Sequence, residues 1–167
     1  DQLERLAPRL GEDSRLAKVN GQGTADLDPV ACTEAIAYDF LARGTGRNGY
    51  LWYADSVSRH QNWADMGRTG AAGVANFLSP YRNSKYRERA LSHARVIGEH
   101  PQSFPDTHGS PIMGMGYTAL AAHVDKRSFR RLLDANKWWF VMSHCCDGTF
   151  YYQPNRDNAG YGGDSRV

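Results

Sequence analysis

The chain has 167 residues, of which 41% are hydrophobic and 23% are charged, a mixture that excludes an intrinsically disordered protein. This length suits a single domain, residues 1–167, with a sizeable core. Its 20 basic and 18 acidic residues leave a net charge of +2, without the concentrated positive charge typical of nucleic-acid-binding proteins.

The first clear helix is predicted from Asp28-Pro29, where a capping residue precedes a proline at the first helical position. Cys32, Ile36 and Phe40 then recur every four residues and predict its buried face, and Gly44 ends the helix. A long polar loop is expected to follow from Thr45 to Ala64.

Two further helices are predicted before residue 100. The first runs from about 65 to 79 and is stopped by Pro80. After a short turn, the second has an apolar stripe and a charged outer side. Its expected inward residues are Tyr86, Ala90, Ala94 and Ile97, and its expected outward residues are Arg87, Glu88, Arg95 and Glu99.

The second half of the chain predicts two more helices and a long ordered loop. Ser110-Pro111 opens the first of these helices, and the second runs from about Lys126 to Ser143. The expected apolar stripe of the first is Met113, Tyr117, Leu120, Ala121 and Val124. The expected inward residues of the second are Phe129, Leu132, Leu133, Trp139 and Phe140. Residues 145–167 form the loop.

Two segments of the chain resemble each other and predict the architecture. Residues 66–72 and 115–122 both begin with Met-Gly, are rich in Gly and Ala, and precede a short turn and a bulkier helix. A helical-hairpin unit of roughly 40–50 residues is typical of a solenoid or closed helical array. The sequence therefore predicts an all-α fold with hairpin repeats at about 65–99 and 110–143.

These hairpins resemble the α/α-toroid superfamily, the barrels of paired helices found in terpenoid cyclases, protein prenyltransferase β-subunits and several glycan-active enzymes. The segments 104–111 (Phe-Pro-Asp-Thr-His-Gly-Ser-Pro) and 146–157 (Cys-Asp-Gly-Thr-Phe-Tyr-Tyr-Gln-Pro-Asn-Arg-Asp) are similar to a bacterial branch of that group. The resemblance implies that the chain forms part of a toroid. Because toroids support many chemistries, it implies no particular reaction.

The connections of such a fold place a candidate site. The turns at 80–83 and 123–126 are short, whereas those at 44–64, 100–109 and 145–167 are long. Because helices alternate in direction, all three long loops are expected at one end, where the inner helices begin. Helix N-termini favour anionic or oxygen-rich ligands, and function concentrates on long loops held by a rigid scaffold.

Polar side chains of these loops are the candidate site residues. Asp106 and His108 are the candidates for acid–base catalysis. The candidates for holding a substrate are Asp65, Arg68, Arg156, Asp157 and the aromatic Tyr151. Two alternatives remain open: the Asp and Arg side chains brace the loops, and the aromatic residues, Tyr50 and Trp52 among them, pack the loops instead of stacking on sugar rings.

These residues lead to three functional hypotheses. The first is a toroid domain that binds or cleaves a polar polymer such as a glycan. The second is a non-catalytic domain that binds a protein partner through an exposed apolar or aromatic patch. A cyclase- or prenyltransferase-like enzyme is the third. Metal or nucleotide cofactors are not expected, because the His and Cys residues lack ligand spacing and the Gly-x-Gly runs lack a strand–turn–helix context.

Location and completeness are also addressed by the sequence. No apolar run is long enough to span a bilayer, and no signal peptide is present. The chain begins at Asp1 without Met and stops at Val167 without a helix-ending signal, which favours a piece cut from a longer protein. A targeting segment lost from that piece leaves a periplasmic or secreted location open, and the remaining repeats of the longer chain are expected as partners.

Overall fold

The computed structural model describes residues 29–52, 66–81, 83–104 and 111–149. Within these ranges it has five α-helices, one short 3-10 helix and no strand. They are α2 (Pro29–Gly44), α3 (Met66–Phe77), α4 (Ser84–Glu99), η1 (Pro101–Ser103), α5 (Pro111–Ala122) and α6 (Lys126–Ser143). The predicted helical class is confirmed for this part of the chain, and no helix in it is long and apolar enough to cross a membrane.

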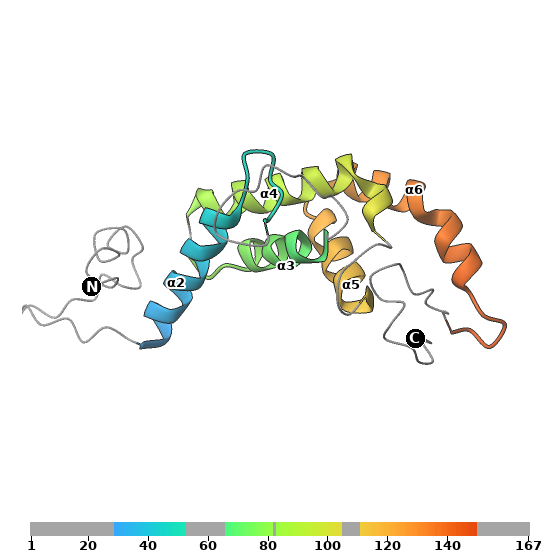
Figure 1. Ribbon diagram of the computed structural model, residues 1–167, viewed down its shortest axis with the longest axis horizontal. Helices are drawn as coiled ribbons and strands as arrows, with labels where there is room; N and C mark the ends of the chain where they lie inside the picture. Colours follow the sequence, from blue (N-terminus) through green and yellow to red (C-terminus); the bar gives the residue numbers. More distant parts are fainter. Residues whose placement is uncertain (1–28, 53–65, 82, 105–110, 150–167) are drawn as a thin grey trace, which may run out of the picture.

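The helices form two layers. The longer helices α2, α4 and α6 follow one another along an arc, and the shorter helices α3 and α5 lie on its concave side (Figure 1). Helix α3 packs against both α4 and α5, and α6 packs against α4 and η1. We call α3 and α5 the inner helices and the other three the outer helices.

The inner helices pack through small residues. A side-chain carbon added at Gly70 of α3 would lie 2.5 Å from the backbone nitrogen of Thr118 on α5. One turn further along, a carbon added at Gly73 would lie 2.8 Å from the Cβ of Ala121. Both contacts advance by one turn in the same direction along the two helices, so α3 and α5 run parallel and their backbones nearly touch.

The core lies between the inner helices and the outer helices α4 and α6. All four predicted inward residues of α4 are buried, and its four predicted outward residues are exposed. On α6, Leu132 and Trp139 are buried, Phe129 and Phe140 pack partly against the core, and Leu133 is exposed. The apolar pattern of α4 and α6 therefore predicts most of their buried face.

Helix α6 begins at a side-chain cap. The Oδ2 atom of Asp125 accepts hydrogen bonds from the backbone nitrogen of Ser128 at 3.0 Å and from its hydroxyl at 2.6 Å. The hydroxyl bond is the largest of the interactions that lower the pKa of Asp125. Helix α4 begins in a similar way, because the Oδ1 atom of Asn83 accepts from the backbone nitrogen of Lys85. Capping side chains of this kind fix where a helix starts.

The predicted buried faces of α2 and α5 are wrong. Ile36 and Phe40 of α2 are exposed, and so are Met113, Tyr117 and Leu120 of α5. Of the predicted stripe, Ala121 is buried, and helix α5 buries Met115, Thr118 and Ala122 together with it. For α5 the physical reason is the close approach of α3. Only small side chains fit between the backbones of α3 and α5, so the large side chains of α5 point to the opposite side.

The start of the predicted loop 45–64 is more ordered than expected. Residues 45–52 form a tight turn closed by a backbone bridge between Thr45 and Leu51. Tyr50, Leu51 and Trp52 are all buried, with the two rings in edge contact at 5.2 Å between centroids. For Tyr50 and Trp52, loop packing is therefore confirmed over a role in stacking on sugar rings.

Candidate functional site

The turn after α2 contacts the start of α3 and the middle of α4. The backbone nitrogen of Gly46 donates to the carbonyl oxygen of Tyr50 at 2.9 Å, and that of Gly49 donates to the carbonyl oxygen of Gly46 at 2.9 Å. Gly49 has a φ of 87°, a left-handed conformation that favours glycine. These features define a closed turn, residues 45–51, which we call the first turn.

Both helices of the following hairpin hold the first turn. The hydroxyl of Thr69 on α3 accepts from the backbone nitrogen of Leu51 at 3.0 Å. Nδ1 of His93 on α4 lies 2.7 Å from the carbonyl oxygen of Gly49. A side chain at Gly49 would clash with the backbone carbonyl of Ser92. The turn is therefore packed directly against α4, with no space for a ligand between them.

His93 is a structural residue and not an acid–base catalyst. It is completely buried, and because a carbonyl oxygen can only accept, its Nδ1 carries the proton donated to Gly49. Burial lowers the pKa of His93 to about 4, the hydrogen bond to Gly49 opposes this shift, and the positive charge of Arg89 adds to it. The imidazole is therefore neutral at physiological pH and out of reach of a substrate.

Arg68 is the one predicted site residue whose surroundings the structure describes. Arg68 lies near the N-terminus of α3 and is half-buried. Its Nη2 atom lies 3.4 Å from the phenol oxygen of Tyr50. Because Tyr50 belongs to the first turn, Arg68 braces this turn against the start of α3. The sequence predicts a site where the inner helices begin, and Arg68 lies near this end of α3.

The other predicted site residues lie outside the described residues. They are Asp65, Asp106, His108, Tyr151, Arg156 and Asp157. Their grouping with Arg68 at one end therefore stays a prediction. Within the described ranges, no three His, Cys, Asp or Glu side chains lie close enough together to hold a metal ion.

The residues that sequence reasoning missed lie on α5. Met113, Tyr117 and Leu120 form an exposed row on the side of α5 opposite its packed residues, and we call this row the α5 face. Their exposed fractions are 55%, 38% and 61%. Their spacing of four and three residues predicts that they share one side of the helix. It does not tell whether this side is buried or exposed. The small residues at Gly70 and Gly73 were the available signal that α5 packs through its other side.

A wide, open groove of about 590 Å³ lies in the outer layer, between the end of α4, η1 and the middle of α6. It is lined by Gly98, Glu99, Pro101, Arg131, Asp134 and Ala135. Glu99, Arg131 and Asp134 are all exposed to solvent. The groove is therefore a surface depression of mixed charge, without the buried polar groups typical of an enclosed active site.

Comparison with known protein families, with curated proteins and with solved structures finds no match to this chain. The predicted resemblance to α/α toroids therefore has no support from a relative.

Proposed function

We propose that the described helices are two hairpins of an α/α helical array, α3 with α4 and α5 with α6, and that the array is a protein-interaction domain. Its partner is an amphipathic polypeptide segment that covers the α5 face. The observation that carries this function is the row of three large, exposed apolar side chains on one inner helix. The second sequence hypothesis named such a patch as its expected feature.

The geometry of the α5 face suits a helical partner. Its first and last side chains are seven positions apart, or about 10 Å at a rise of 1.5 Å per residue. An apolar row of this length matches the contact surface of an amphipathic helix, whose anchors recur with the same spacing. Helix α5 itself lies on the concave side of the arc beside the other inner helix, α3 (Figure 1).

The proposal is tested by a charge placed at one end of the row. Peptides selected by display on the wild-type protein should lose at least about tenfold in affinity with Leu120→Lys, because a binding anchor is typically worth more than 1 kcal/mol. Fluorescence anisotropy with a labelled peptide measures this loss. Since Leu120 is exposed, the thermal unfolding midpoint should stay within a few degrees of that of the wild type.

The matched control is Leu133→Lys, an exposed leucine on the outer helix α6. This variant should bind the selected peptides as well as the wild type does. Equal loss of binding in both variants, or peptides that bind Leu120→Lys unchanged, would show that the α5 face is not the binding surface.

A glycan remains the second candidate ligand, favoured by one observation. Arg68 of α3 and Tyr117 of α5 hold matching positions in the two Met-Gly segments, each just before a fully buried threonine. Neither side chain is fully buried, and the two come from neighbouring, parallel helices. A guanidinium and an aromatic ring placed in this way suit the hydroxyls and the apolar face of a sugar ring.

The glycan proposal predicts separate effects on binding and turnover. If an array of immobilised glycans identifies one that the wild type binds, Tyr117→Ala and Arg68→Ala should weaken its binding at least about tenfold, because both contacts would be lost directly. Asp106→Ala and His108→Ala should abolish release of reducing sugar from the same glycan while retaining binding. If all four variants bind and cleave like the wild type, the glycan proposal is wrong.

A further inference from the structure

A second turn, residues 144–149, reproduces two backbone hydrogen bonds of the first turn. The backbone nitrogen of Cys145 donates to the carbonyl oxygen of Thr149 at 2.8 Å, as Gly46 does to Tyr50. Gly148 donates to the carbonyl oxygen of Cys145 at 3.1 Å, and its φ of 84° matches the 87° of Gly49. The first turn begins directly after α2 and the second directly after α6.

A side chain supports each turn in the same way. Oδ1 of Asn48 accepts from the backbone nitrogen of Tyr50 at 3.1 Å, and Oδ1 of Asp147 accepts from that of Thr149 at 3.0 Å. Every matched pair is separated by 99 residues, as from Gly49 to Gly148. Four shared features at constant spacing identify one structural unit that occurs twice, an outer helix followed by a glycine turn.

The two copies differ in what covers them. The first turn is covered by the α3–α4 hairpin, which supplies the Thr69 hydroxyl and the His93 ring. Gly49 is buried against Ser92, whereas Gly148 is exposed, and a side-chain carbon added there would have no atom of the described residues within 4 Å. The second turn thus presents to solvent a surface that the first turn packs against a helical hairpin.

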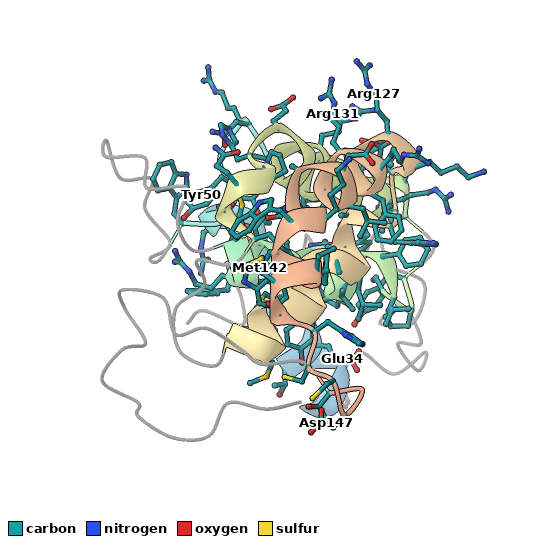
Figure 2. All side chains as sticks on the ribbon, turned by 90° about the vertical axis from the view of Figure 1, so that its right-hand side faces the viewer. Glu34, Tyr50, Arg127, Arg131, Met142 and Asp147 are labelled. Carbon is teal, nitrogen blue, oxygen red and sulfur yellow. The ribbon has the colours of Figure 1, made fainter. Side chains whose placement is uncertain are left out.

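The apolar surface of α6 continues to this uncovered turn. Trp138, Val141 and Met142 are 59%, 74% and 74% exposed and share one side of the last turns of α6, and we call them the α6 end face. In the view onto this end of the molecule, Met142 faces the viewer, and Asp147 lies below it on the second turn (Figure 2). An exposed apolar cluster next to an uncovered turn is typical of a docking surface.

We propose that the α6 end face and the second turn together dock a further helical hairpin of the α3–α4 kind. Its inner helix is rich in small residues, and its outer helix carries a buried histidine that donates to the carbonyl oxygen of Gly148, as His93 does to Gly49. A second copy of this chain is the less suitable occupant, because its own α3–α4 hairpin already covers its first turn. The surface is separate from the α5 face.

The test adds a hairpin of this kind to the end of the chain. Since the spacing of 99 residues makes Val167 the counterpart of Arg68, a second copy of residues 69–104 fused directly after Val167 continues the register of the repeat. Hydrogen exchange of the peptide covering residues 141–149 should slow by about tenfold or more relative to the parent chain, because docking protects its amides. Helical content measured by circular dichroism should rise.

Three variants of the fusion make the test specific. Met142→Lys, Gly148→Asn and replacement by leucine of the fused histidine that corresponds to His93 should each return the exchange rate towards that of the parent. Asparagine is chosen because it tolerates a positive φ, so Gly148→Asn should change the parent chain little. Leu120→Lys on the α5 face should leave the slowed exchange of the fusion unchanged.

Two results would overturn the proposal. One is a fusion whose residues 141–149 exchange as fast as those of the parent, whether or not the added segment folds. The other is a parent chain that dimerises in sedimentation experiments and becomes monomeric with Met142→Lys, since a second copy would then be the occupant.

Discussion

Replacing Gly70 by alanine should destabilise the protein by about 2–3 kcal/mol, the upper range for forcing extra atoms into a packed core. The added methyl group would lie 2.5 Å from the backbone nitrogen of Thr118 and 2.6 Å from the carbonyl carbon of Tyr117. These are main-chain atoms of a helix and cannot turn aside as a flexible side chain does. Relief therefore requires α3 and α5 to separate, which opens the core they share with α4. Chemical denaturation of the two proteins measures the loss.

The neighbouring inner helix provides a control of opposite sign. Gly116 is an exposed glycine of α5, and a side-chain carbon added there would have nothing within 4 Å. Alanine at this position should stabilise the protein by about 0.5–1 kcal/mol, because it restricts the unfolded chain and favours the helix. Gly116→Ala thus measures helix propensity, whereas Gly70→Ala measures the contact between the inner helices. Equal effects of Gly70→Ala and Gly116→Ala would show that the inner helices are not in close contact.

The contrast between these glycines also explains what the sequence could predict. Helix α6 was predicted with its bounds, and four of its five predicted inward residues lie in or against the core, because large apolar residues at helical spacing are a local signal. Helix α5 was predicted with the right start, but its predicted stripe extended past the end of the helix at Ala122 and lay largely on the wrong face. A hydropathy pattern gives weight to Met113 and Leu120 and almost none to glycine or alanine. Which side of the helix packs was decided by Gly70, on another helix.

The candidate site was harder to predict for a related reason. Tyr50 and Trp52 belong to a loop that the sequence predicts to be polar. They are nevertheless buried, because the first turn packs against a hairpin that follows it in the chain. His93 lies within a helix predicted correctly, but its burial depends on a carbonyl 44 residues earlier. Long-range contacts of this kind leave no periodic signal. The first and second turns are also hard to match by sequence, because only the glycine and the preceding Asn or Asp recur clearly. Their equivalence is visible in their hydrogen bonds.

The buried histidine gives the second large prediction, a loss of stability in mild acid. The unfolded chain titrates His93 near its ordinary pKa of 6.5, whereas burial lowers the folded value to about 4. Between these two values the unfolded state binds more protons, so the free energy of unfolding decreases as the pH falls. The contribution of neutral His93 to the free energy of unfolding is constant above about pH 6.5 and is lost in full below about pH 4. It amounts to about 3 kcal/mol.

The variant His93→Asn isolates this contribution, because its amide nitrogen can still donate to the carbonyl oxygen of Gly49 but does not titrate. Its free energy of unfolding should be lower than that of the wild type at pH 7 and should vary less between pH 6.5 and pH 4. The lowered pKa values of Asp125 and Asp147 act in another window, since their contribution is lost only as the pH falls below the ordinary carboxyl value of 3.8. Denaturant midpoints measured at half-unit steps of pH separate the two windows. If wild type and variant keep the same pH dependence above pH 4, His93 does not anchor the first turn as a neutral donor, and the hydrogen bond predicted for a hairpin docked on Gly148 loses its precedent.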